Sequence, residues 1–248
     1  MSTFQKFGDL KETPMNSFYR FSLLLGIFVI SFSKFALAQV NEDQVGAWYM
    51  YFYDNKFSSS QFGVQGDVQF RNYDFGADLE QLLLRSGLTY RPKNANLKLT
   101  AGLGHITSGT PGESNDTNTE IRIYQEALLP HKLTDRLSLT HRFRYEQRYV
   151  EGQDFRTRYR YNLFVKVLLN DTESTKGGIY LTAYNELFIN GEKCIGDDRY
   201  VEYFDRNRLY FALGYGVSKK MNLQAGVMRQ TLDAVSKDQV QLSIHHQF

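Results

Sequence analysis

The chain has little cysteine, histidine or proline. Its single cysteine, Cys194, excludes an intramolecular disulfide and a metal site built from several thiolates. Five scattered histidines do not offer the converging ligands of a zinc site. Four prolines are few enough for an all-β chain to place them in turns. We therefore expect no metal and no cofactor.

Long apolar runs are also missing. Residues 21–32 form an apolar run that is too short for a membrane span, which needs ~20 residues. Arg20 precedes it, and Ala36-Leu37-Ala38 supplies the small residues that a signal peptidase reads. We predict a cleaved signal peptide over residues 1–38 and an exported mature domain over residues 39–248. A buried helix or a membrane anchor is the alternative for this segment, and no cysteine follows the cleavage site to make a lipoprotein.

The mature chain has no excess of charge of either sign. The full chain carries +2, and removing residues 1–38 takes away four basic and two acidic residues, which leaves 25 of each. This balance gives no support to a nucleic-acid partner. No mature segment is apolar for 18 residues, which excludes transmembrane helices. A mean hydropathy of −0.44 suits a barrel wall, because only alternate residues of such a wall face lipid.

The last nine residues of the chain alternate between the two faces of a strand. Val240, Leu242, Ile244, His246 and Phe248 point one way, and the residues between them point the other. A terminal strand that ends on Phe resembles the C-terminal signal of bacterial outer-membrane β-barrels. The resemblance implies the Gram-negative outer membrane, with its lipid and lipopolysaccharide as surroundings. It also implies recognition of the strand ending at Phe248 by the barrel-assembly machinery.

Similar alternation recurs along the mature chain and predicts eleven strands. A high aromatic content of 15% is typical of residues that gather at membrane interfaces. Bacterial single-chain barrels have even strand numbers, so we predict an up-and-down barrel of twelve strands, with ten as the alternative. Either one strand is hidden in the long loops, or residues 39–47 run through the lumen. A soluble β-sandwich or lipocalin-like barrel is the competing architecture. The eleven predicted strands cover residues 48–53, 62–71, 82–90, 97–104, 121–129, 137–146, 158–167, 179–188, 208–217, 222–228 and 240–248.

The connections between these strands alternate in part between short and long. Segments 92–96, 170–177 and 218–220 are typical of periplasmic turns, and 109–118 and 190–199 of extracellular loops. If the C-terminus lies in the periplasm, the alternating direction of the strands places all three turns on the periplasmic side and both loops on the extracellular side.

Several short motifs resemble a known family. Gly46-Ala47-Trp48 opens the first strand, the second strand ends in Arg71, and Tyr90-Arg91 leads into a turn. Together with Arg142, Arg144, Glu146 and Arg148, these residues resemble the uncharacterised outer-membrane barrel family filed as domain of unknown function 2490. The likeness covers residues 44–248. It implies the barrel fold and the location, and it brings no activity with it.

Turning the apolar residues outward directs a set of arginines into the lumen. Arginine is always charged, and its planar fork grips carboxylates in pairs. Fewer acidic residues share this inward face. The predicted inward residues are Arg71, Arg85, Arg122, Arg142, Arg144, Arg148, Arg156, Arg158, Arg160, Lys166, Arg206 and Arg208, with Asp67, Glu120, Glu126, Glu146 and Glu186.

Two interpretations of this interior stay open. A track of arginine forks would pass small acidic solutes from site to site, as an anion-preferring channel requires. Alternatively, Arg–Glu ladders fill a closed structural or surface-interaction barrel, with loops 109–118 and 190–203 binding a partner. In that case Glu146 pairs with Arg144 and Arg148, and Glu186 with Arg206 or Arg208.

An enzymatic function is not expected. A lipid hydrolase needs a Ser and a His within hydrogen-bond reach, whereas the three-residue spacing of His105 and Ser108 sends their side chains to opposite strand faces. His245 and His246 oppose each other for the same reason. Glu186 with an inward Tyr184 is more simply a lumen carboxylate, so we expect no catalytic residues. A lipid-modifying enzyme is the third and least favoured hypothesis.

Overall fold

A computed structural model describes residues 45–248, except 77, 113, 171–175 and 234. The predicted signal peptide and residues 39–44 lie outside the described residues. In the part that is described, the regular elements are all strands, and no helix is both long and apolar enough to cross a membrane. The strands are β1 (Gly46–Lys56), β2 (Phe62–Asn72), β3 (Leu79–Tyr90), β4 (Lys98–Gly109), β5 (Thr117–Lys132), β6 (Leu137–Val150), β7 (Arg156–Leu168), β8 (Ile179–Asn190), β9 (Phe204–Ser218), β10 (Met221–Thr231) and β11 (Ser236–Gln247).

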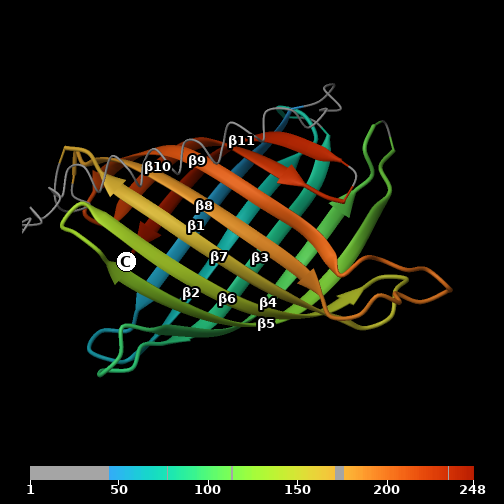
Figure 1. The fold of residues 1–248 in the computed structure, drawn as a ribbon, viewed down its shortest axis with the longest axis horizontal. Coiled ribbons are helices and arrows are strands. Elements are labelled where there is room, and N and C mark those ends of the chain that lie inside the picture. The colour runs from blue at the N-terminus through green and yellow to red at the C-terminus, as the bar shows by residue number, and fades with distance from the viewer. Residues whose placement is uncertain (1–44, 77, 113, 171–175, 234) are drawn as a thin grey trace, which may run out of the picture. The chain divides into compact units, whose positions relative to one another are not determined.

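These strands form one closed barrel in which each pairs with its neighbours in sequence (Figure 1). Every consecutive pair is antiparallel. Nine of the eleven alternating segments predicted from the sequence lie entirely within these strands, and segments 97–104 and 240–248 each extend one residue beyond theirs. The predicted all-β barrel fold is therefore confirmed.

The predicted count of twelve strands is not confirmed. The closed sheet contains eleven described strands, and β1 closes it by pairing with β11 in parallel. Gly46 lies opposite Gln239, and the register continues to Asp54 opposite Gln247. An odd number leaves the first and last strands running the same way, and a parallel ladder satisfies their backbone groups as an antiparallel one would. The eleven strands of the described residues therefore differ from the even number expected of bacterial barrels.

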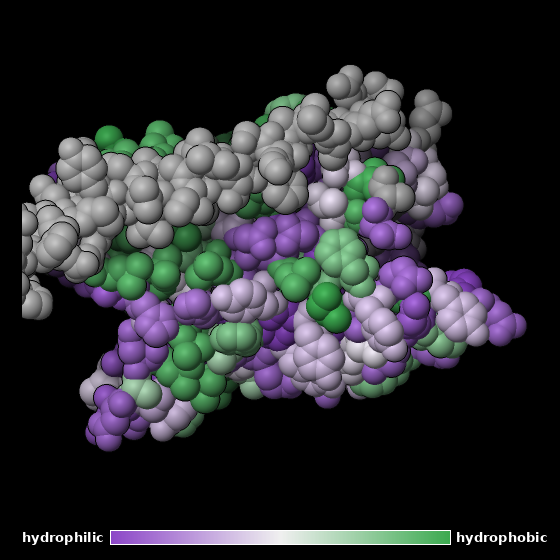
Figure 2. All heavy atoms as spheres, viewed as in Figure 1, coloured by the Kyte–Doolittle hydropathy of each residue, from purple (hydrophilic) through white to green (hydrophobic). Residues whose placement is uncertain are grey.

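The two faces of each strand differ in polarity, as a period of two requires. On β2, Asp67 and Arg71 are buried inside the barrel, while Val68 and Phe70 are 41% and 49% exposed outside it. Large exposed apolar side chains recur on the outward faces of the other strands, for example Leu88, Leu103 and Val227. Figure 2 shows apolar side chains on the wall and hydrophilic ones at the loop tips.

The antiparallel connections separate two ends of the barrel. The connections after β1, β3, β5, β7 and β9 lie at one end with the C-terminus, and those after β2, β4, β6, β8 and β10 lie at the other. We call them the turn end and the loop end. The predicted turns and loops fall at opposite ends, as expected, with 191–203 the longest loop that the structure describes in full.

Candidate functional site

The candidate site is the charged interior of the barrel. Eight of the predicted arginines are no more than 8% exposed, and Arg85 is 9% exposed. Arg142 and Arg206 retain 18% and 25% exposure of their side chains. The inward set predicted from strand parity is therefore interior in the structure, together with Asp67, Glu120, Glu126, Glu146 and Glu186.

Three glutamates on β5, β6 and β8 form the centre of a continuous network. Glu146, which is 1% exposed, pairs with Arg158 at 2.7 Å and with Arg160 at 2.6 Å. Arg160 also pairs with Glu186 at 2.5 Å. Charged hydrogen bonds of this length are the strong class, and each carboxylate here bridges two guanidinium groups.

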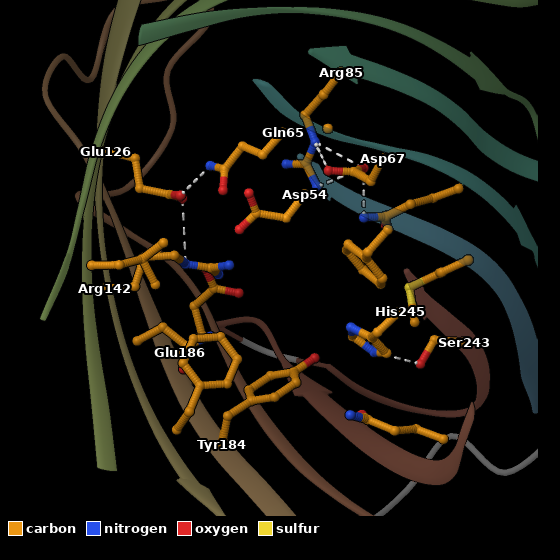
Figure 3. A pocket seen from close by; sticks show the side chains of 18 of the residues that line it. Asp54, Gln65, Asp67, Arg85, Glu126, Arg142, Tyr184, Glu186, Ser243 and His245 are labelled. Atoms are coloured by element: carbon orange, nitrogen blue, oxygen red, sulfur yellow. Dashed lines mark hydrogen bonds and ion pairs between the residues drawn. The ribbon is translucent and has the colours of Figure 1, made fainter. Parts of the chain in front are cut away.

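Arg142 and Arg144 on β6 extend this network to β5. Arg142 donates to Glu186 at 2.6 Å and lies 3.8 Å from Glu126. Arg144 donates to Glu126 through Nε and Nη2, at 2.8 and 2.5 Å. Figure 3 shows Glu126, Arg142 and Glu186, which come from β5, β6 and β8, close to one another in the interior. We call Glu126, Arg142, Arg144, Glu146, Arg158, Arg160 and Glu186 the arginine–glutamate network.

A second cluster lies nearer the loop end. Glu120 accepts from Arg122 at 2.6 Å and from Arg148 at 2.5 Å. Asp205 pairs with Arg158 at 2.8 Å and with Arg206 at 3.1 Å, and so links this end to the network through Arg158.

The predicted ladder partners were partly wrong. Arg148 pairs with Glu120 and not with Glu146, and Glu186 pairs with Arg142 and Arg160. Although Arg208 lies directly opposite Glu186 in the β8–β9 register, no ion pair joins their side chains in the described part of the chain. Inside a closed barrel the side chains converge, so a long arginine reaches past the adjacent strand. Arg142 on β6 reaches Glu186 on β8 in this way.

The ring of Phe188 packs in the barrel interior beside the arginine–glutamate network. Phe188 is 1% exposed, and four guanidinium carbons lie near its ring. Arg160 lies 4.4 Å from the ring centroid, Arg208 4.7 Å, Arg158 5.3 Å and Arg206 6.0 Å. Cations over an aromatic face are attracted by its quadrupole. The Phe188 ring therefore stabilises the positive charge of the arginines around it.

A cavity of about 370 Å³ lies between the network and the turn end (Figure 3). Its lining runs from Asp54, Lys98 and Gln247 near the turns inward to Trp48 and Arg208. Beyond that level, Arg158, Phe188, Gln230 and Gln239 are each at most 4% exposed. The cavity is therefore blind, and we call it the turn-end cavity.

The cavity is also lined by Ser243 and His245, whose contact the sequence reasoning missed. Ser243 Oγ lies 3.0 Å from His245 Nε2, and the His245 ring stacks on Phe52 with 4.8 Å between centroids. Their spacing of two on one strand was the available signal. Among the described residues no carboxylate hydrogen-bonds to His245, so the pair lacks the orienting acid of a hydrolase triad.

The other serine and histidine assignments agree with strand parity. His105 is exposed on the outer face, while Ser108 accepts a hydrogen bond from Gln81 at 3.1 Å. His246 turns outward to Tyr51, 2.9 Å from its hydroxyl. Within the part of the chain that the structure describes, no three His, Cys, Asp or Glu side chains gather as metal ligands.

The 191–203 loop folds against the neighbouring connection at the loop end. Asp154 donates its backbone N–H to Ile195, and Glu192 accepts from the Thr157 hydroxyl at 2.9 Å. Lys193 pairs with Glu202 at 2.9 Å, which raises the pKa of the Lys193 ammonium. Cys194 is exposed as a free thiol. The loop therefore has its own internal structure.

The barrel and its family motifs agree with a comparison against known families. The model of the family described as "Protein of unknown function (DUF2490)" matches residues 45–241. The chain belongs to this family. The match begins one residue before β1 and ends within β11, so the family covers almost the whole described barrel. Comparison with curated proteins and with solved structures finds no match.

Proposed function

We propose that this member of the family is an outer-membrane β-barrel with a closed interior, which acts as a structural or surface-interaction protein. The observation that carries the proposal is the arginine–glutamate network. Glu126, Glu146 and Glu186 each contact at least two arginines, and these side chains fill the barrel together with Phe188. Satisfied charge pairs of this kind suit a packed interior.

The outward belt of apolar side chains supports the membrane part of the proposal. Leu88, Leu103, Val227 and Leu213 are between 53% and 61% exposed. A soluble protein rarely leaves so much large apolar surface in contact with water, whereas lipid favours it. Outer-membrane lipid and lipopolysaccharide are then the surroundings, and the strand ending at Phe248 is the segment that the assembly machinery recognises.

The network also weighs against conduction. An anion-preferring channel needs arginine donors that are free for the passing solute, but here carboxylates of the network and of Asp67, Glu120 and Asp205 pair with most of the inward arginines. The loop end offers the surface for a partner, since Tyr200 and Tyr203 of the 191–203 loop are 68% and 56% exposed. Exposed tyrosines are typical of binding surfaces. In this proposal the barrel performs no catalysis.

Two experiments test the proposal. Membrane fractionation of expressing cells should recover the mature chain, which starts at Gln39, in the outer membrane, and its gel mobility should change on boiling. Recovery in a soluble fraction would contradict the location. Proteoliposomes should not swell faster than protein-free liposomes in small sugars or carboxylates. Rapid swelling in carboxylates would favour the anion-preferring channel instead.

A further inference from the structure

Two buried arginines at the inner end of the turn-end cavity have no carboxylate partner. Arg71 and Arg208 are each 6% exposed, yet neither takes part in an ion pair within the described part of the chain. Arg71 donates to Gln69 at 2.6 Å and to Gln81 at 2.9 Å. Arg208 donates to Gln230 at 2.8 Å. These hydrogen bonds therefore go to neutral acceptors, and among the described residues no carboxylate lies in ion-pair contact with either guanidinium.

Both guanidinium groups lie against the same indole. The Cζ atom of Arg71 is 3.7 Å from the centroid of the Trp48 ring, and that of Arg208 is 4.9 Å from it. Trp48 directs its own N–H away, to Glu80 at 3.1 Å. Glu80 also accepts from Gln239 at 3.2 Å, so the described hydrogen bonds of this carboxylate go to other donors and it makes no ion pair with Arg71.

The cavity as a whole carries an excess of positive charge. Seven of its charged lining residues are basic, and only four, Asp54, Asp67, Glu126 and Glu186, are acidic. A buried guanidinium without a carboxylate in ion-pair contact is costly, and two of them beside one cavity favour the entry of an anion. Each guanidinium can grip a carboxylate or phosphate through two parallel hydrogen bonds.

A second observation points to a ligand in the same cavity. Asn162 is 1% exposed and lines the cavity wall, but neither its Oδ1 nor its Nδ2 atom has a hydrogen-bond partner among the described residues. Buried polar groups are nearly always hydrogen-bonded. A polar molecule in the cavity would satisfy this amide, and the volume of about 370 Å³ falls within the range of small-molecule sites.

We propose that the turn-end cavity binds a small organic anion, whose carboxylate or phosphate group lies at Arg71 and Arg208 beside Trp48. The rest of the molecule packs against Tyr184, Tyr210 and Met50, which line the same cavity. Because the network closes the other side, the anion enters and leaves through the turn end. A barrel can hold such a ligand without conducting it, so this site stands independently of the closed-barrel proposal.

Trp48 provides the readout, because it is the only tryptophan in the chain. The refolded protein is titrated with citrate and, separately, with inorganic phosphate, at an ionic strength held constant with sodium chloride. We expect a saturable change in Trp48 emission with at least one of the two anions, and the responding anion identifies the acidic group preferred. Calorimetric titration of the same samples detects binding that leaves the emission unchanged.

Substitution assigns the binding to the two arginines. Arg71→Gln and Arg208→Gln should each weaken the binding by roughly tenfold or more, because each removes charge-assisted hydrogen bonds to the anion. Arg208→Lys, which retains the charge without the fork, should weaken it less. Arg229→Gln is the matched control, since Arg229 pairs with Asp238 outside the cavity, and should bind like the parent.

The gel mobility of each variant before and after boiling shows whether it has folded. Absence of saturable binding by both methods would overturn the proposal, as would folded arginine variants that bind like the parent. Neither result depends on whether the barrel conducts, so the two proposals fail separately.

Discussion

Arg158 grips Glu146 with two nitrogens, Nε at 2.9 Å and Nη2 at 2.7 Å from the same carboxylate oxygen, in a pair that is at most 4% exposed on either side. The other oxygen of Glu146 accepts from Arg160 at 2.6 Å. This arrangement places Glu146 at the centre of the network, because its carboxylate is shared by two arginines of β7.

Removing that carboxylate should destabilise the barrel strongly. Glu146→Gln leaves Arg158 and Arg160 buried with less compensation, and breaking a buried pair in this way costs about 3–5 kcal/mol. Urea-dependent unfolding from lipid vesicles measures the change in the free energy of unfolding. Asp238→Asn is the control, because the Arg229–Asp238 pair is 31% and 40% exposed, and such a pair contributes about 0–1 kcal/mol. Equal effects of the two substitutions would contradict the structural role of the network.

A cysteine pair tests the parallel closure of the barrel. Tyr51 on β1 lies opposite Ile244 on β11, and neighbouring strands are about 4.8 Å apart, within the reach of a disulfide. In a Cys194→Ser background, Tyr51→Cys with Ile244→Cys should cross-link on oxidation, as seen on a non-reducing gel. Tyr51→Cys with Val240→Cys, four residues out of register, should not. An additional strand between β1 and β11 would prevent the first link.

Introducing a charged side chain on the outer wall tests whether lipid or water surrounds the barrel. Leu103 on β4 is 61% exposed. If it faces the bilayer midplane, Leu103→Arg should reduce the free energy of unfolding from vesicles by about 2–4 kcal/mol. In a soluble barrel the same change should stay within about 0.5 kcal/mol. Leu133→Arg, in the connection after β5, is the control and should be near neutral in both cases.

Tight packing over glycines inside the barrel predicts a further effect. A Cβ atom at Gly214 would lie 2.1 Å from the Tyr180 ring, and Tyr180 is only 2% exposed. Gly214→Ala should therefore lower the free energy of unfolding by about 1–3 kcal/mol, the usual cost of overpacking. Gly76→Ala, where a Cβ meets nothing within 4 Å, should cost far less. A tolerated Gly214→Ala would mean that the Tyr180 ring moves freely.

Local patterns in the sequence were sufficient to place the strands and the inward arginines. Alternation at Val68, Phe70 and Arg71 carries this information within a few residues, because strand geometry has a period of two. The pairing of β1 with β11 is not local, since no pattern within either strand records which partner closes the sheet. The sequence therefore left the strand count to the even-number rule for bacterial barrels.

The ion-pair partners also depend on the closed shape. Arg142 reaches Glu186 across β7, which a flat sheet does not predict. Arg208 makes no ion pair with the glutamate opposite it, because that glutamate, Glu186, is held by Arg142 and Arg160. The Ser243–His245 contact, in contrast, was available from a spacing of two on one strand.

Single-channel recording in a planar bilayer tests the central claim most directly. With the refolded protein inserted in symmetric salt, the closed interior predicts no resolvable current steps across the accessible range of voltage. Insertion is verified separately by the heat-dependent gel mobility of the same sample. Steady, reproducible current steps from the unmodified protein would contradict the claim, and an anion preference in those currents would favour the arginine-lined channel.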